Sequence, residues 1–553
     1  MSQPAPEQRP GNGAWPPGES PATGPADERV LAGMRLVPDP GTRLVADGAV
    51  LVGGSPIRVL RLTPAGSRQV SQWLSGAPVP EGAAARTLAR RLLDSGAAHP
   101  DWPSYRGPAQ GPTLTDVTVV IPVRDRHDEL ARCLAGLSIP GALPPAPVAE
   151  VIVVDDGSAD PAAIEAIAAA AGARVIRRPV NGGPGAARNT GLAATTTELV
   201  AFLDSDCVPA PGWLDGLLPH FTDPAVGAVA PRIIPHEQGR GWLARYEGAS
   251  STLDMGARPS IVRPGARISY VPGAALVVRR GAAGGGFDPR MHVGEDVDFV
   301  WRLSAGGWRV RYEPAAVMGH RHRVRLRPWF ARRSDYGTSA ALLEARHPGS
   351  VRPLYASWWT VTAWGAAIAL RPRPAGMAVG AGITAGATAL LAKKLARVTG
   401  EGWPLPGTSA TPTRGERLAY GQEWVPTAGG RFGGSKGGVA PLGGSAWRLA
   451  IRLAGGGTLA AGRPLGSAIS RTWWPVAIPL ALAVPRLRVP VAALVLAPPL
   501  LDWADRRPPL DPARYVAARL LDDVAYSTGV WKGCVRRRSF RALLPVIGSR
   551  PAQ

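Results

Sequence analysis

LVAFLDSD, at residues 199–206, joins an apolar run directly to a pair of carboxylates. Five apolar residues without polar alternation are typical of a strand that is buried on both faces of a parallel sheet. Asp204 and Asp206 follow at once and, two residues apart, project to the same side of the chain. Hard divalent cations prefer such oxygen ligands, so this pair is a candidate site for Mg²⁺ or Mn²⁺. The same pair could instead only cap a turn.

Similar apolar runs precede this stretch and alternate with helical patterns. Ligands of an alternating α/β domain bind beyond the carboxyl ends of its strands. The acidic motifs of this chain stand at those ends, and the expected fold is a doubly wound α/β domain over residues 115–327. The other expected strands are residues 117–121, 151–154 and 174–176, and the expected helices are residues 161–170 and 184–194.

Two motifs on this side of the domain are candidates for nucleotide binding. Asp155 and Asp156 end the second strand, where a carboxylate can accept hydrogen bonds from a uracil edge or a ribose, or can cap the helix that follows. The stretch NGGPGAARN, residues 181–189, is a glycine-rich turn that opens a helix. Its backbone amides and Arg188 would face a phosphate, although such a turn also occurs without a ligand.

A second acidic pair, Glu295 and Asp296, lies far beyond the first. A helix that begins here would place a carboxylate at its N-terminus, near the substrate crevice. Asp296 is suited to take a proton from an acceptor hydroxyl, and the alternative is helix capping by Glu295 and Asp298. Arg302 could reach an anion or pair with Asp298 one turn away.

His320 and His322 follow later in the chain. A neutral imidazole could complete a metal shell or contact a diphosphate. Either histidine could also be structural, and His320 is the better candidate.

Taken in order, these motifs resemble family 2 glycosyltransferases with the GT-A fold, over about residues 115–325. That resemblance implies a mixed sheet, a nucleotide-sugar donor, a divalent metal at the Asp-x-Asp motif, and inverting transfer by single displacement. No Gln-x-x-Arg-Trp motif appears, which argues against a processive synthase. The resemblance implies that Asp125 and Asp156 contact the nucleoside, that Asp204 and Asp206 lie at the metal, that Asp296 is the base, and that the loop Pro272, Gly273 and Ala274 lies on the acceptor side. Together with the residues argued above, the candidate site comprises Pro122, Arg124, Asp125, Asp155, Asp156, Asn181, Gly182, Arg188, Asp204 and Ser205 for the donor, Asp204, Asp206 and His320 for the metal, Asp296 with Glu295 for catalysis, and Gly273, Ala274 and Arg302 for the acceptor side.

The flanking regions narrow the resemblance. Residues 30–100 alternate short strands and helices like a winged-helix module and resemble the PqqD-like peptide-recognition domain. Residues 522–534 resemble the C-terminus of mycofactocin system glycosyltransferases. This implies glucose transfer from UDP-glucose, in β linkage, to a peptide-derived redox cofactor precursor.

The remaining segments complete the expected domain plan. Two apolar stretches, residues 355–370 and 375–392, could form a membrane hairpin or buried helices. The N-terminus has no apolar run, so we expect no secretory signal and a catalytic domain at the cytoplasmic face of the membrane. The other expected segments are a disordered terminus at 1–29, linkers at 101–114 and 400–445, a helical region at 328–399 and a C-terminal helical, membrane-associated region at 446–553.

The formal net charge of +22 leaves the class of partner open. A basic chain can serve nucleic acid, an anionic membrane or a phosphorylated substrate. The basic residues are spread along the chain without a concentrated recognition helix, so we expect no nucleic-acid partner. The alternative to a peptide-derived acceptor is a lipid or cell-wall glycan. The three cysteines are far apart in sequence and indicate a reducing compartment.

Overall fold

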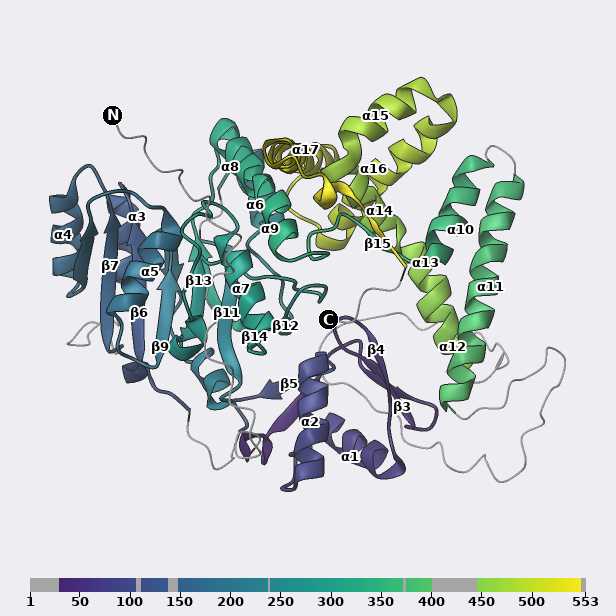
Figure 1. The fold of residues 1–553 in the computed structure, drawn as a ribbon, viewed down its shortest axis with the longest axis horizontal. Helices are drawn as coiled ribbons and strands as arrows, with labels where there is room; N and C mark the ends of the chain where they lie inside the picture. Colours follow the sequence, from purple (N-terminus) through teal and green to yellow (C-terminus); the bar gives the residue numbers. More distant parts are fainter. Residues whose placement is uncertain are drawn as a thin grey trace, which may run out of the picture.

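The computed structural model shows a mixed sheet flanked by a small N-terminal unit and by a group of C-terminal helices (Figure 1). The terminus expected at 1–29 and the linker expected at 400–445 lie outside the described residues, except that Arg29 begins η1 and Ser445 begins α12. The structure describes residues 29–105, 111–137, 148–236, 239–370, 374–399 and 445–548.

The mixed sheet has the strand order β10-β14-β11-β13-β9-β6-β7-β8, and β12 pairs with β14. Its β9, β6, β7 and β8 strands run parallel, whereas β13 runs antiparallel to both β9 and β11. A hydrophobic cluster covers each face. The strands are β6 (Val117–Val123), β7 (Glu150–Asp156), β8 (Arg174–Arg178), β9 (Leu199–Leu203), β10 (Cys207–Pro209), β11 (Val226–Pro235), β12 (Ser260–Val262), β13 (Ala275–Arg279) and β14 (Arg309–His320).

This sheet confirms the α/β fold class and the four expected strands, and it adds strands that the periodicity did not reveal. Prolines interrupt β11 and β14, and both strands shift register between Pro231 and Arg232 of β11, so neither shows a clean strand pattern. The helices around the sheet are η2 (Leu114–Asp116), α3 (His127–Leu137), α4 (Pro161–Ala170), α5 (Pro184–Ala194), η3 (Leu218–Thr222), α6 (Trp242–Ser250), η4 (Arg280–Ala283), α7 (Glu295–Ala305), α8 (Leu326–Thr338) and α9 (Ala340–Arg346).

The N-terminal unit has its own apolar core and is docked on the sheet domain by ion pairs. The two terminal guanidinium nitrogens of Arg90, Nη1 and Nη2, donate to the buried Asp223 at 2.6 and 3.1 Å, and Arg309 pairs with Asp94 at 2.6 Å. Removing one partner of a buried pair leaves an uncompensated charge, so this docking is specific. The elements are η1 (Arg29–Leu31), β1 (Arg35–Pro38), β2 (Arg43–Val45), β3 (Val50–Gly53), β4 (Arg58–Arg61), α1 (Pro64–Leu74), α2 (Ala83–Ser95) and β5 (Ala98–Asp101).

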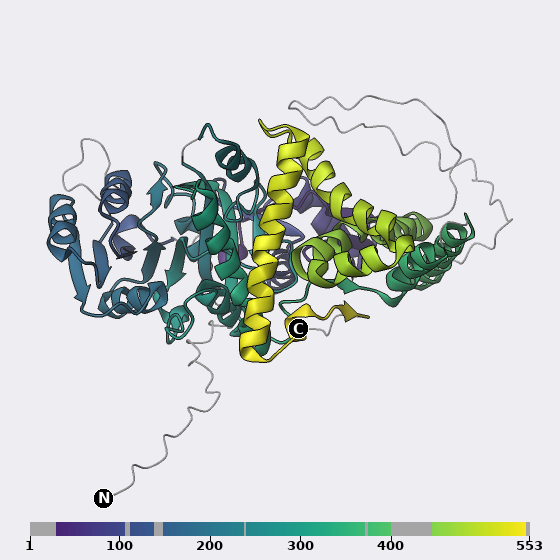
Figure 2. The ribbon, with the colours of Figure 1, turned by 90° about the horizontal axis from the view of Figure 1, so that it is seen from above.

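The C-terminal helices turn back onto the sheet domain. Figure 2 shows α17 running beside α8. Glycines allow this close approach, since a Cβ atom added to Gly529 would lie 1.8 Å from the Ser334 carbonyl oxygen. The elements are β15 (Tyr355–Ala356), α10 (Trp358–Ala369), α11 (Pro374–Thr399), α12 (Ser445–Ala450), η6 (Ile451–Gly455), α13 (Gly456–Ala460), α14 (Gly462–Ala468), η7 (Ile469–Trp473), α15 (Trp474–Ala483), α16 (Pro485–Arg506), α17 (Pro512–Arg537), η8 (Arg541–Leu543) and β16 (Val546–Ile547).

Two of these helices are long and apolar enough to cross a membrane, by length and composition only: Ala375–Ala396 and Pro485–Arg506. The C-terminal end of α11 packs against β3, where Leu395 meets the apolar side chains of Val50 and Val52. The exposed large apolar side chains of α11 are Met377 and Val379 near its N-terminal end and Leu390 farther along.

Candidate active site

A cavity of about 770 Å³ opens where β6, β7 and β9 end, which is within the usual size of a small-molecule site. Of the predicted site residues, the following line this cavity: Pro122, Arg124, Asp156, Asn181, Arg188, Asp204, Ser205, Asp206, Ala274, Glu295, Asp296 and His320. The following do not: Asp125, Asp155, Gly182, Gly273 and Arg302.

Arg188 connects the two acidic motifs. Its guanidinium donates to Asp204 Oδ1 at 2.6 Å and to Glu295 Oε1 at 2.9 Å, and the residue is only 2% exposed. Burial opposes the charged form of Arg188, but the charges of Asp204 and Glu295 outweigh it and raise the pKa above its ordinary value. The guanidinium predicted to face phosphate is therefore held between two carboxylates of the protein.

Asp206 lies between Arg126 and His320. Arg126 donates to Asp206 Oδ2 at 2.5 Å, and His320 Nε2 lies 3.4 Å from Asp206 Oδ1. Burial favours the protonated carboxyl, yet His320 and Arg126 keep the pKa of Asp206 well below its usual range. Asp206 Oδ1 and His320 Nδ1 are buried and form no well-aligned hydrogen bond with any described residue.

Asp206 Oδ1, with the His320 imidazole beside it, fits a divalent cation that takes only part of its shell from the protein. Within the described ranges, no three His, Cys, Asp or Glu side chains form a ready-made metal cluster. The Asp204 carboxylate pairs with Arg188, so Asp206 and His320 are the two side chains that remain as candidate metal ligands. Mg²⁺ is commonly bound by one or two protein ligands together with substrate phosphates and waters.

Asp296 is held in the first turn of α7. Its Oδ2 accepts from the Gly273 amide at 2.9 Å, and its Oδ1 accepts from the Val297 amide at 2.8 Å. Gly294, with φ of 79°, begins the helix in the left-handed conformation that glycine adopts without strain. The carboxylate is thus oriented by backbone groups while it faces the cavity.

Glu295 differs from its neighbour because it is buried. Burial and the adjacent charge of Asp296 raise the pKa of Glu295 to about 7, although Arg188 opposes the shift. Two neighbouring carboxyls in unlike surroundings are a common feature of acid–base sites.

Asp155 and Asp156 organise the loops at the end of β7, where Asp156 reaches the cavity. Asp156 accepts from the amides of Gly182 and Gly183 at 3.0 and 2.8 Å and pairs with Arg178 at 3.0 Å. Asp155 instead accepts from the Ser158 amide and pairs with Arg177 outside the cavity lining. Asp156 therefore holds the glycine-rich turn, and Asp155 stabilises the loop after β7.

The other predicted residues outside the lining have structural partners. Asp125, at a φ of 52°, accepts from the Ala159 amide at 2.7 Å. Arg302 donates to Asp298 at 2.9 Å and to the Gly286 carbonyl at 2.6 Å. Of the two roles expected for Arg302, the structure thus shows the pairing with Asp298 one helical turn away. His322 contacts Glu247 at 3.5 Å, and burial together with His320 lowers the pKa of His322 to about 3, so the ring is neutral.

The cavity also has a wall that the sequence motifs did not predict. It comes from the loop before β13, from α8, from η7 and from α17. The packing of α17 on α8 brings the α17 residues to the cavity, and the resemblance seen in residues 522–534 gave Tyr526 no role in the site. The residues of this wall include Tyr270, Arg332, Tyr336, Arg471, Thr472 and Tyr526.

Comparison with known proteins places this geometry in context. The family model for glycosyl transferase family 2 matches residues 118–283. The chain is 38% identical over 529 residues to the "Pre-mycofactocin glycosyltransferase" of Mycobacterium tuberculosis, an alignment that covers 94% of this chain and 99% of that protein. It is 31% identical over 216 residues to "Succinoglycan biosynthesis protein ExoU" of Rhizobium meliloti, covering 36% of this chain and 59% of that one. A solved structure, "Mannosyltransferase PcManGT from Pyrobaculum calidifontis in complex with GDP-Man and Mn2+", is similar at 21% identity with a TM-score of 0.33, covering 54% and 84% of the two chains.

Proposed function

The chain belongs to glycosyltransferase family 2, and on that premise we propose that it transfers glucose from UDP-glucose, with inversion to a β linkage, to a peptide-derived redox cofactor precursor. The similarity to the pre-mycofactocin glycosyltransferase over nearly its whole length supports this acceptor class. The N-terminal unit supports it as well, because β4 is a mostly exposed edge strand of the β2-β3-β4 sheet, and such an edge can hold an extended peptide by β-augmentation.

One observation carries the proposal. Asp296 and Asp206 face the same cavity, and Arg188 joins their two motifs through Asp204 and Glu295. Single displacement needs a base beside the incoming hydroxyl and positive charge beside the departing diphosphate. Asp296 would take the proton from the acceptor hydroxyl, while Arg126 and Arg188 lie on the side where negative charge develops.

A divalent cation is part of the proposal. Asp206 and His320 would hold it, with donor phosphates completing its shell. When bound, such an ion offsets the charge on the departing nucleotide diphosphate. Asp204 would remain the anchor of Arg188.

The test is a transfer reaction with purified protein. We would incubate it with Mg²⁺ or Mn²⁺, pre-mycofactocin and a panel of nucleotide sugars, and would follow the acceptor by mass spectrometry. A mass gain of one hexose with UDP-glucose, and a β signal in the proton NMR spectrum, is expected. No mass gain with any donor would overturn the proposed function.

The role of Asp296 is tested by Asp296→Asn. The amide cannot accept the proton, so turnover is expected to fall about 10²- to 10⁴-fold while UDP-glucose still binds. Asp215→Asn is the matched control, because Asp215 is exposed and lies outside this cavity. Near wild-type turnover of Asp296→Asn would remove Asp296 as the base.

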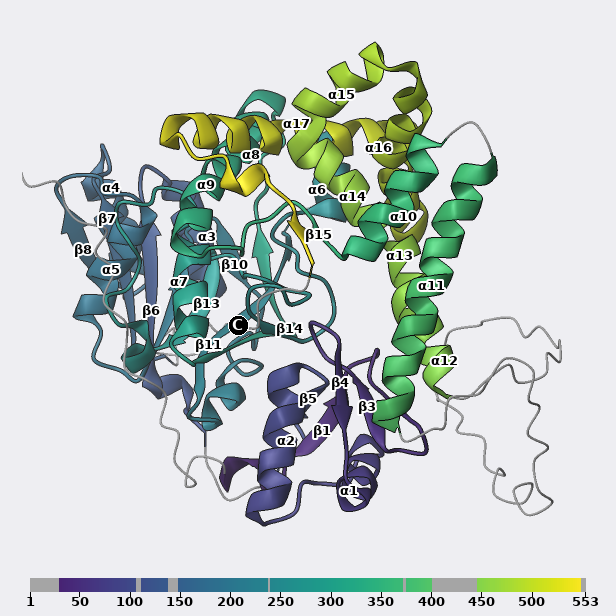
Figure 3. The same ribbon diagram turned by 45° about the vertical axis from the view of Figure 1, so that its right-hand side comes forward.

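We further propose that the protein works at a membrane surface. The exposed apolar residues Leu370 and Met377 lie where α10 and α11 approach each other, and Leu482 and Val489 lie beside the α15–α16 turn. Figure 3 shows both hairpin ends on the same side of the molecule, away from the sheet. Exposed apolar residues gathered on one side of a molecule mark interaction sites, and interfacial helices bury such residues in the headgroup region. A lipid acceptor is the alternative that this surface favours.

One measurement tests the membrane contact, and a second distinguishes a lipid acceptor from a peptide-derived one. Flotation with phosphatidylglycerol-containing vesicles is expected to carry the protein, and Leu482→Glu combined with Met377→Glu is expected to abolish flotation. Unchanged flotation of that double variant would remove these hairpin ends as the membrane contact. Sugar incorporation into extracted lipid, without incorporation into pre-mycofactocin, would establish the alternative acceptor.

A further inference from the structure

The C-terminal segment contributes a wall of the cavity. Arg471 and Thr472 reach it from η7, Tyr526 and Val530 reach it from α17, and Ala542 reaches it from η8. η7 is a single π-helical turn inserted between α14 and α15. Such turns occur rarely and are frequent at functional sites, because they change the direction of the side chains that they carry.

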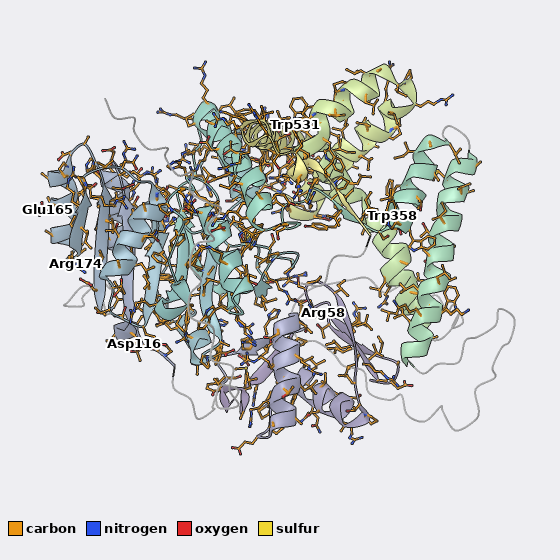
Figure 4. All side chains as sticks on the ribbon, viewed as in Figure 1. Arg58, Asp116, Glu165, Arg174, Trp358 and Trp531 are labelled. Atoms are coloured by element: carbon orange, nitrogen blue, oxygen red, sulfur yellow. The ribbon has the colours of Figure 1, made fainter. Side chains whose placement is uncertain are left out.

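This wall is fixed in place by buried contacts. The Trp531 indole, labelled in Figure 4, donates to the Thr472 carbonyl at 2.8 Å. Ser470 donates to Asp523 at 2.6 Å, and both side chains are buried. α17 also packs closely on α8 through its glycines. These contacts hold η7 against α17, with Arg471 and Thr472 of η7 at the cavity.

The wall carries two tyrosine hydroxyls that no described protein group uses, whereas its guanidinium, that of Arg471, also lies 3.7 Å from the Asp523 carboxylate. Neither the Tyr270 nor the Tyr526 hydroxyl forms a hydrogen bond with another described residue. Burial, followed by the nearby Tyr526, raises the pKa of Tyr270 to about 12, and burial raises the pKa of Tyr526 as well, so both remain protonated donors at neutral pH. The Arg471 guanidinium lies over the Tyr526 ring, 4.6 Å from its centroid. Tyrosine hydroxyls without a described partner, on residues that line a cavity, indicate a ligand that supplies the missing hydrogen bonds.

The wall stands on the Asp296 side of the cavity. Tyr270 is in the loop that leads to Gly273, whose amide binds the Asp296 carboxylate. Along this edge of the sheet the strands follow the order β7, β6, β9, β13. Asp156 lies at the end of β7, Asp204 and Asp206 follow β9, and the loop that contains Tyr270 precedes β13. The wall is thus on the far side of Asp204 and Asp206 from the nucleotide motif.

We propose that Tyr270, Arg471 and Tyr526 form an acceptor subsite that the C-terminal helices add to the glycosyltransferase domain. The subsite fits a compact acceptor with an apolar body, which packs on Val530 and Ala542, and with an amide carbonyl or carboxylate that accepts from the phenols and the guanidinium. This inference rests on the proposed function, because it assigns the acceptor of the same reaction.

The test separates the KM for the acceptor from the KM for the donor. Wild-type, Tyr526→Phe and Arg471→Ala proteins are assayed with UDP-glucose and pre-mycofactocin. Loss of one neutral hydrogen bond is expected to raise the acceptor KM about 3- to 10-fold for Tyr526→Phe, and loss of a charged one about 10- to 100-fold for Arg471→Ala. The KM for UDP-glucose is the internal reference and is expected to change less than twofold. Arg471→Lys, which keeps the charge, is expected to recover part of the loss.

Arg463→Ala is the matched control for Arg471→Ala. Arg463 lies in the same helical segment but is exposed and pairs with Asp505 at 3.0 Å outside the cavity. An acceptor KM that moves no more than the donor KM in both Tyr526→Phe and Arg471→Ala would overturn the subsite while leaving the proposed function intact. Wild-type protein that transfers no sugar to pre-mycofactocin would overturn the proposed function and the subsite together.

Discussion

Replacing Glu295 by glutamine is expected to stabilise the protein at alkaline pH. Glu295 is buried beside Asp296 and Arg188, and its pKa is raised to about 7 from an ordinary value of 4.5. A raised pKa in the folded state means that the folded chain binds this proton more tightly than the unfolded chain. The stability is therefore fully present below pH 4.5 and is lost as the pH rises through 7.

The size of this effect follows from the two pKa values. A difference of one pKa value corresponds to about 1.4 kcal/mol, so the difference between 4.5 and about 7 amounts to about 3 kcal/mol. Glutamine has the shape of the protonated acid and can still accept from Arg188. We expect the wild-type protein to lose about 2 to 3 kcal/mol of unfolding free energy between pH 5 and pH 8 that Glu295→Gln does not lose.

Urea denaturation followed by tryptophan fluorescence at pH 5, 6, 7 and 8, in EDTA to exclude metal, measures this difference. Glu165→Gln is the matched control, because Glu165 is exposed on α4, far from the cavity (Figure 4). The control is expected to follow the wild-type pH dependence. Parallel pH profiles for wild type and Glu295→Gln would refute the reasoning, since they would show that Glu295 titrates alike in the folded and unfolded chains.

The remaining predictions concern packing, docking and metal. Gly529→Ala places a methyl group against the Ser334 carbonyl oxygen and is expected to displace α17. Transfer to pre-mycofactocin is expected to fall by a larger factor than the KM for UDP-glucose rises. Equal effects on both would contradict the close packing. Asp223→Asn leaves the buried Arg90 without its charged partner and is expected to cost about 3 to 5 kcal/mol of docking energy, seen as a lower free energy of unfolding in urea, whereas an unchanged unfolding profile would contradict a specific dock. EDTA is expected to abolish transfer, and Asp206→Ala is expected to raise the Mn²⁺ concentration needed to restore it; full activity in EDTA would exclude a metal requirement.

Most of the fold was predictable because buried parallel strands have a local signature. β6, β7 and β9 are continuous apolar runs, each followed by residues that the chain turns out of the sheet. β14 lacks that signature, since Pro314 interrupts it and its register against β11 shifts. The pairing of β11, β13 and β14 depends on contacts across long sequence distances, which periodicity does not report.

Part of the candidate site was likewise visible in the sequence, and part depends on contacts between distant residues. The carboxylates of Asp204, Asp206 and Asp296 could be named because acidic residues after a strand or at a helix start are visible in the sequence. The role of Arg188 was not visible, because its partner Glu295 is 107 residues away. Its position after a glycine-rich turn suggested phosphate, whereas folding surrounds it with two carboxylates.

The amino-acid sequence alone was therefore enough to infer the α/β class, the position of the acidic motifs and the family. Buried strands and the carboxylates that follow them are each encoded by a few neighbouring residues. Folding alone determined that residues of η7 and α17 line the cavity, and that Tyr270 and Tyr526 lie together in its wall. The physical reason is the helix crossing of α17 on α8. Gly529 allows that approach, and a crossing is a property of two surfaces rather than of either sequence segment.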